Sequence, residues 1–125
     1  DVVTNTGIGT ANRSYPRGLD TEIFGFLALE KANNNATARY QREHVTPYIY
    51  ENEKHIYYYQ NTIDQSRYRW TLDTKEDWEL ISGIYKYLYH GKHDFYLDEI
   101  IKLMEEHPEL YYLNKDVEQK ELKGW

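Results

Sequence analysis

The sequence predicts an α/β chain, in which short strands lead into helices and the C-terminal part is helical. Three observations favour this class. Short runs rich in β-branched and aromatic residues are bounded by turn-forming residues, as is typical of strands. Longer segments repeat apolar residues at helical spacing. A length of 125 residues favours one domain with one modest hydrophobic core.

The N-terminal segment predicts the end of one strand, a loop and a second strand. Val2 and Val3 are typical of the end of a buried strand, and the chain opens without an initiator Met. Residues 5–18 are rich in Asn, Gly, Ser and Thr, which indicates a loop. The run TEIFGF at 21–26 predicts a short strand. We therefore expect this chain to begin in the middle of a fold.

Two helices are predicted next. The first covers residues 27–33 and frays in the three asparagines at 33–35. The second covers residues 39–52, where apolar residues recur at helical spacing. Pro47 either kinks this second helix or restarts it with Thr46 as the cap.

Two tyrosine- and tryptophan-containing strands follow. The first is expected at 55–60. The second is expected at 67–72, where Tyr68, Trp70 and Leu72 alternate with polar residues. A polar loop separates the two strands.

The C-terminal part is predicted to form two helices. Residues 74–77 (TKED) fit a capping box, in which Thr74 accepts the amide of Asp77 and the Asp77 side chain reaches back. The helix after this box ends at Gly91, and its apolar stripe consists of Trp78, Ile81, Tyr85 and Leu88, with Ile84 beside them. The last helix ends at Pro108, and its apolar face carries Leu97, Ile100, Ile101 and Met104.

Charge and composition narrow the classes of function. The formal net charge of −6 argues against a nucleic acid as the main partner. Apolar runs fall far short of the ~18 residues that span a bilayer, so no membrane partner is expected. The absence of cysteine is compatible with the cytoplasm, where we expect the protein. The 14 tyrosines suit core and interface positions.

Asp73 is a candidate metal ligand. It lies between the strand that ends at Leu72 and the helix cap Thr74. Ligands of open α/β sheets bind at the carboxyl ends of strands, and Mg²⁺ prefers one or two protein carboxylates with substrate phosphates and water. Position alone favours the plainer alternative, in which Asp73 does no more than complement the helix dipole.

Four blocks of the sequence resemble one known family. In chain order they are YPRGLDTEIF, REHVTPYIY, RWTLDTKEDWELI, and DEIIKLMEEHPEL with LNKDVEQK. They resemble the spore-coat polysaccharide cytidylyltransferase-like family, which is related to the synthetases that activate 3-deoxy-manno-octulosonate and sialic acid with CTP. The resemblance covers the C-terminal half of such a protein. It implies the matching half of a nucleotide-diphospho-sugar transferase-like mixed sheet flanked by helices.

The resemblance also assigns the parts of the chain. Residues 1–18 would be a strand end and loop, 19–72 the acceptor-side strands and helices, and 73–125 the C-terminal helices. The family's nucleotide-binding loop and its Asp-x-Pro metal site are not in these 125 residues. We therefore expect a fragment of a longer protein.

The implied reaction is transfer of CMP from CTP to an acidic sugar with release of pyrophosphate, in surface polysaccharide biosynthesis. The resemblance implies Mg²⁺ as cofactor, Asp73 as the second metal-binding aspartate, and a homodimer. The residues that it places toward substrates are Arg17, Asp20, Glu22, Glu43 and His44. Two alternatives stay open: an ion pair between Arg17 and Asp20, and a non-catalytic fragment or diverged module that acts in dimerisation.

Overall fold

The computed structural model describes residues 1–9 and 11–120. It is a mixed α/β structure with a three-stranded sheet and flanking helices, which confirms the predicted fold class. The described residues cluster into two compact units. Unit 1 contains Asp1–Tyr15 and Leu19–Ser66 with Gln119 and Lys120, and unit 2 contains Pro16–Gly18 and Arg67–Glu118. No helix of the described residues is long and apolar enough to cross a membrane.

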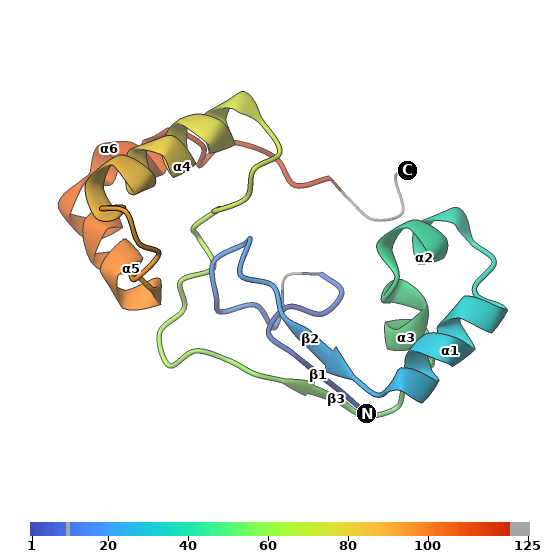
Figure 1. Ribbon diagram of the computed structural model, residues 1–125. Helices are drawn as coiled ribbons and strands as arrows, with labels where there is room; N and C mark the ends of the chain where they lie inside the picture. Colours follow the sequence, from blue (N-terminus) through green and yellow to red (C-terminus); the bar gives the residue numbers. More distant parts are fainter. Residues whose placement is uncertain (10, 121–125) are drawn as a thin grey trace. The chain divides into compact units, whose positions relative to one another are not determined.

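The sheet of unit 1 has the strand order β2-β1-β3 (Figure 1). Its central strand β1 (Val2–Thr4) pairs antiparallel with β2 (Glu22–Phe24) and parallel with β3 (Ile56–Tyr58). Val2 is buried, as predicted for a strand end in a core. The core around it consists of Val2, Ala32, Ile49 and Tyr50, with Phe24, Ala28, Tyr48 and Ile56 packed against them.

Three helices belong to unit 1. Helix α1 (Phe26–Asn35) continues through the asparagines where fraying was expected, and the Asn35 side chain donates to the Lys31 carbonyl. Helices α2 (Arg39–His44) and α3 (Pro47–Asn52) are separate, so Pro47 restarts the helix. Thr46 occupies the cap position, but its side chain makes no capping hydrogen bond.

The prediction of a strand at 67–72 is wrong. The segment is extended but forms one isolated parallel bridge, between Arg17 and Arg69. Around it, Arg17 N donates to Tyr68 O, and Trp70 N donates to Arg17 O. This close approach requires glycine at position 18, because a Cβ on Gly18 would lie 2.2 Å from the Trp70 carbonyl oxygen. The turn that serves as partner is too short to build a ladder.

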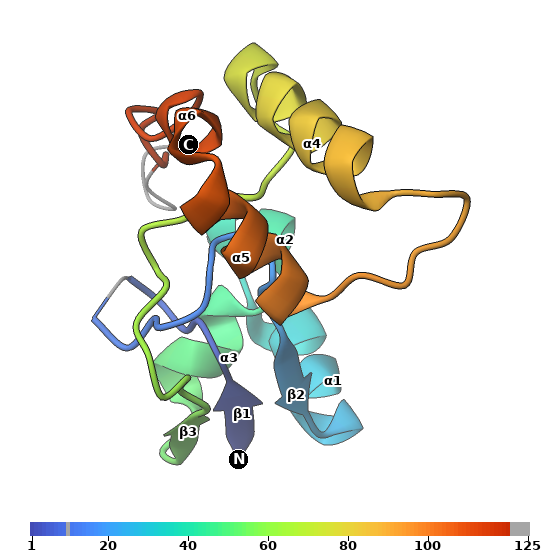
Figure 2. The ribbon, with the colours of Figure 1, turned by 90° about the vertical axis from the view of Figure 1, so that its left-hand side faces the viewer.

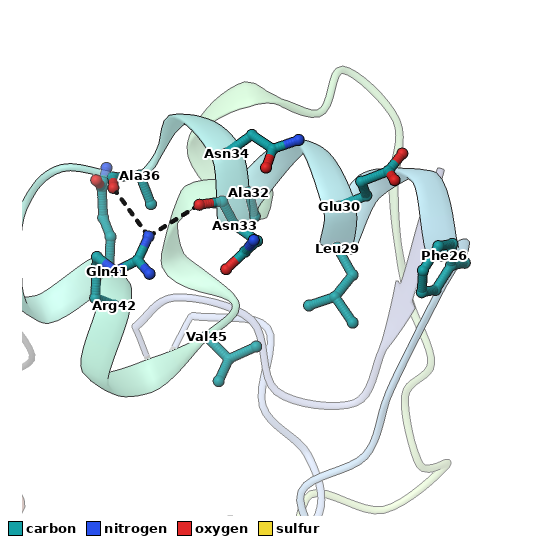
Figure 3. A pocket seen from close by; sticks show the side chains of 10 residues that line it. All are labelled: Phe26, Leu29, Glu30, Ala32, Asn33, Asn34, Ala36, Gln41, Arg42 and Val45. Carbon is teal, nitrogen blue, oxygen red and sulfur yellow. Dashed lines mark hydrogen bonds between the residues drawn. The ribbon is translucent and has the colours of Figure 1, made fainter.

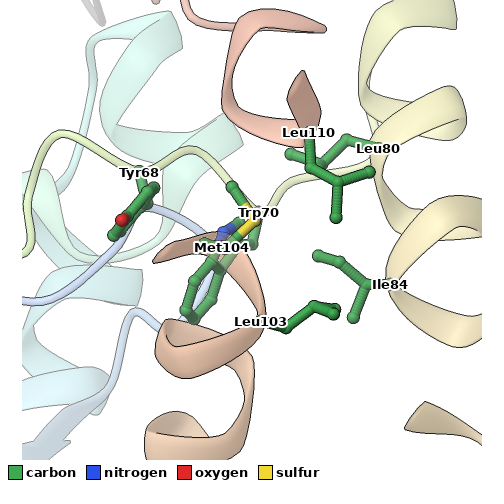
Figure 4. Close-up of a cluster of buried hydrophobic side chains, with 7 residues drawn as sticks. All are labelled: Tyr68, Trp70, Leu80, Ile84, Leu103, Met104 and Leu110. Atoms are coloured by element: carbon green, nitrogen blue, oxygen red, sulfur yellow. The ribbon is translucent and has the colours of Figure 1, made fainter. Parts of the chain in front are cut away.

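Helices α4 (Lys75–Leu88), α5 (Leu97–Glu106) and α6 (Pro108–Tyr112) form the rest of unit 2 (Figure 2). Pro108 therefore ends α5, as predicted, and also begins a further short helix. The core is made by Tyr68, Trp70, Leu80, Ile84, Leu103, Met104 and Leu110 (Figure 4).

The buried face of α4 differs from the predicted stripe. Its buried residues are Asp77, Leu80 and Ile84, whereas Trp78 is 62% exposed and Tyr85 is also exposed. Asp77 turns inward because it pairs with buried Arg69. The line of buried residues therefore begins one position before Trp78. The other predicted members are confirmed, since Ile84 belongs to the core and Ile81 and Leu88 are partly buried against it.

Candidate functional site

Asp73 stands at the start of α4, between the extended segment and the cap residue Thr74. Its carboxylate is 67% exposed, and one oxygen, Oδ2, accepts from Arg69 Nη2 at 3.3 Å. Thr74 Oγ1 accepts from Asp77 N at 3.2 Å, as the capping box predicts. The reverse bond differs from the prediction, because Asp77 Oδ2 accepts from the amide of Asp73 at 3.0 Å, one residue before the cap.

Asp77 is the centre of a buried polar network. Its side chain is 0% exposed and receives both Nε and Nη2 of Arg69, each at 3.0 Å. Thr71 Oγ1 and Asn114 Nδ2 also donate to its carboxylate, each at 2.8 Å. Burial by itself raises the pKa of Asp77, but these four donors and the Asp73 amide outweigh it and hold the pKa well below its usual range.

The chemistry of Asp73 fits a hard cation. Mg²⁺ is held by one or two protein carboxylates, with water and substrate phosphates completing its shell. Asp73 offers a largely solvated carboxylate at the end of an extended segment. Within the described ranges, no three His, Cys, Asp or Glu side chains gather as a metal-binding group. Asp73 would therefore hold such an ion as a single protein ligand from this part of the chain.

Asp20 is held by a buried arginine that the sequence analysis did not single out. Arg13 donates to both oxygens of Asp20 and to Thr6 Oγ1. The Arg13 side chain is 6% exposed, and that of Asp20 is 46% exposed. The Asn5 side chain holds the main chain on both sides of Asp20, since it donates to Leu19 O and accepts from Thr21 N, both at 2.8 Å.

Glu22 lies on β2 in register with Thr4 of β1, close to a buried tyrosine that sequence reasoning also missed. Burial raises the pKa of Tyr50, the nearby Thr4 hydroxyl opposes this, and the Glu22 carboxylate raises the pKa further. The Tyr50 hydroxyl nevertheless has no hydrogen-bond partner of normal geometry. Thr4 and Glu22 therefore act on it mainly through proximity.

Glu43 and His44 end α2, in the same unit as Asp20 and Glu22. Glu43 pairs with Arg39 at 3.8 Å. After His44 the chain turns sharply: Val45 has φ +66°, and Thr46 N donates to His44 O at 2.7 Å. A β-branched residue rarely adopts this conformation, so the end of α2 is a strained turn.

Arg17 and Asp73 belong to unit 2, and the other four predicted residues belong to unit 1. The roles assigned to these side chains stay predictions.

A cavity of about 540 Å³ lies between α1 and α2 (Figure 3). Arg42 crosses one end of it and donates to Asn33 O at 2.9 Å and Ala36 O at 3.4 Å. The remaining lining residues are Phe26, Leu29, Glu30, Ala32, Asn34, Gln41 and Val45.

Comparison with known proteins supports a nucleotidyltransferase-like fold. The chain is similar to the structure of a cytidylyltransferase from Leptospira borgpetersenii serovar Hardjo-bovis, with a TM-score of 0.77 and 30% identity. This match covers 96% of this chain and 48% of that chain. The fold of this chain is nucleotidyltransferase-like.

A second similarity is to an uncharacterised protein of Methanocaldococcus jannaschii. The two sequences are 38% identical over 107 residues, which is 82% of this chain and 43% of that protein. The chain thus spans less than half the length of both relatives. No protein-family model matches the chain.

Proposed function

We propose that this chain is the C-terminal part of a sugar nucleotidyltransferase, which makes a CMP-sugar from CTP and an acidic sugar for a surface polysaccharide such as that of a spore coat. The chain would supply contacts to the acceptor sugar and one metal-binding carboxylate. The similarity to a cytidylyltransferase over 96% of this chain carries the proposal. The acidic acceptor and the pathway rest on the four sequence blocks. Such an enzyme would act in the cytoplasm, where CTP is made available.

In this reaction an acceptor oxygen attacks the α-phosphorus of CTP. A new oxygen–phosphorus bond forms, the bond from the α-phosphorus to the bridging oxygen breaks, pyrophosphate leaves, and the acceptor hydroxyl gives up its proton to water. Mg²⁺ would neutralise the negative charge that gathers on the phosphoryl oxygens. The protein's main task is then to position the reactants.

The residues of this chain would divide that task. Asp73 would hold Mg²⁺ through its exposed carboxylate. Asp20 and Glu22 would hydrogen-bond to hydroxyls of the acceptor sugar. Glu43 and His44 would make further contacts with that sugar. Arg17 would meet a carboxylate or phosphate, because its planar guanidinium suits both anions.

Replacement of Asp73 by Asn tests the proposal in the full reading frame that carries these residues. We expect kcat, measured as pyrophosphate release from CTP with a panel of acidic sugars, to fall about a hundredfold or more. The reason is the loss of several kcal/mol of transition-state stabilisation. The free energy of unfolding should change by less than about 1 kcal/mol. Asp98→Asn is the matched control, since Asp98 is another exposed acid near the N-terminus of a helix. A near-normal kcat at saturating Mg²⁺ would show that Asp73 has no metal role.

A second candidate function is self-association. Exposed tyrosines lie on or beside β3 (Tyr57, Tyr58 and Tyr59) and on α4 and its C-cap (Tyr85, Tyr87 and Tyr89). Tyrosine suits interfaces because its ring is apolar and its hydroxyl is polar. A homodimer is therefore expected. Light scattering over a dilution series tests this, and a monomer mass at every concentration would contradict it.

A further inference from the structure

We propose that Asp77 is a positioning residue for Asp73. In this inference Asp77 fixes the main chain at Asp73 and retains the guanidinium of Arg69, so that the Asp73 carboxylate stays available to a cation. The inference rests on the proposed function, since the availability of Asp73 matters only if Asp73 holds a metal ion. Ligand-orienting partners of this kind are a regular part of metal sites.

The first step is the main-chain anchor. Asp77 Oδ2 accepts from Asp73 N at 3.0 Å and from Thr71 Oγ1 at 2.8 Å. One carboxylate oxygen thereby holds both ends of the short segment from Thr71 to Asp73. Because the segment has no ladder partner at Asp73 in the described structure, this contact decides where the Asp73 side chain leaves the main chain.

The second step concerns the positive charge of Arg69, whose side chain is 8% exposed. Two of its nitrogens reach Asp77 at 3.0 Å, whereas its single bond to Asp73 is longer, at 3.3 Å. Asp77 is therefore the main counter-ion, and Asp73 remains largely solvated. If Asp77 lost its charge, buried Arg69 would take Asp73 as its counter-ion instead and compete with any cation there.

The third step identifies a residue that acts only through the other two. Asn114 is 2% exposed and follows α6 in the chain. Its Nδ2 donates to Asp77 Oδ1 and to the Arg69 carbonyl, both at 2.8 Å. It thus orients the Asp77 carboxylate, although the contacts of its side chain are with Asp77 and Arg69 rather than with Asp73.

The test is a titration with Mn²⁺, followed by electron paramagnetic resonance, of the protein from the full reading frame. Asp77→Asn should weaken Mn²⁺ binding by about tenfold or more, as is typical when an outer-shell partner of a metal ligand is removed. Asn114→Ala should weaken Mn²⁺ binding by a smaller factor, because Asn114 contacts Asp77 rather than Asp73. The double variant Arg69→Met with Asp77→Asn should recover part of the affinity, because no buried cation then competes for Asp73, although the Asp77 carboxylate that anchors the main chain is still missing. Ile84→Val is the control, since it loosens the same core without touching the network.

The outcomes separate the two hypotheses. If Asp73→Asn leaves Mn²⁺ binding unchanged, the metal role of Asp73 and the proposed function built on it fail. If Asp73→Asn abolishes binding while Asp77→Asn and Asn114→Ala bind Mn²⁺ as tightly as Ile84→Val does, the positioning role is overturned. Asn114→Ala keeps both charged residues, so it decides the question even if Asp77→Asn does not fold.

Discussion

Replacing Asp20 by Asn should destabilise the protein more than replacing its partner Arg13 by Met, although Asp20 is the more exposed of the two. The Arg13 side chain is 6% exposed and that of Asp20 is 46% exposed. Asp20→Asn leaves a buried guanidinium without its counter-ion. Arg13→Met leaves a carboxylate that water already reaches and keeps an apolar side chain of similar length in the interior.

The magnitudes follow from these burials. Removal of one partner from a buried ion pair costs about 3–5 kcal/mol, and the partial exposure of Asp20 places Asp20→Asn near the lower end. Arg13→Met loses the bonds to Asp20 and Thr6 but strands no buried charge, so we expect about 1–2 kcal/mol. The double variant should resemble Arg13→Met alone, because the two residues act as one pair.

Urea unfolding followed by far-ultraviolet circular dichroism measures these differences. Amide hydrogen exchange at Thr6 and Thr21 shows whether the loss is local to the loop and turn that the pair joins. If Asp20→Asn costs less than Arg13→Met, the guanidinium finds other compensation and the reasoning from burial is refuted. Asp20 would then be the more credible as a group reserved for substrate.

Two more predictions follow from burial. Leu80→Ala should lower the free energy of unfolding by about 3–4 kcal/mol, because Leu80 is 0% exposed. Trp78→Ala should lower it by less than about 1 kcal/mol, because Trp78 is largely exposed. Equal costs of the two variants in urea unfolding would contradict the observed buried face of α4. Burial raises the pKa of Tyr50, so the stability that its neutral form preserves is present below about pH 10 and is lost as the pH rises further. Tyr50→Phe should therefore make stability less sensitive to alkaline pH, and an unchanged profile between pH 8 and the alkaline limit would show that Tyr50 does not govern it.

Elements whose signals are local were predictable from the sequence. Pro47 marks a helix start through its own fixed backbone, and Thr74 caps α4 through a bond to a residue three positions away. The strand at 67–72 failed because a strand also needs a neighbour, and alternation does not reveal one. The stripe on α4 failed at Trp78 because a charged residue, Asp77, takes the buried position.

The candidate site divides in the same way. The place of Asp73 between an extended segment and a cap could be read from neighbouring residues. Its support could not, since Asn114 reaches Asp77 across 37 residues of sequence. Arg13 likewise stood in a polar loop where solvation is the ordinary expectation, and it pairs with Asp20 seven residues later. A net acidic chain with an arginine in an Asn- and Gly-rich loop offered no local signal of a buried cation.

The pairing of the buried arginines bears on how this chain would serve a reaction at a triphosphate. Arg13 is held by Asp20, and Arg69 by Asp77 with Asp73. Both positive charges that are buried in the described residues are thus already matched by carboxylates and have little left to offer a phosphate. In a chain of net charge −6, the cation that we propose at exposed Asp73 would be the more effective way to neutralise phosphoryl charge. The distribution of charge therefore supports the proposal of a metal-assisted role for this part of the protein, rather than one in which its buried arginines bind phosphate directly.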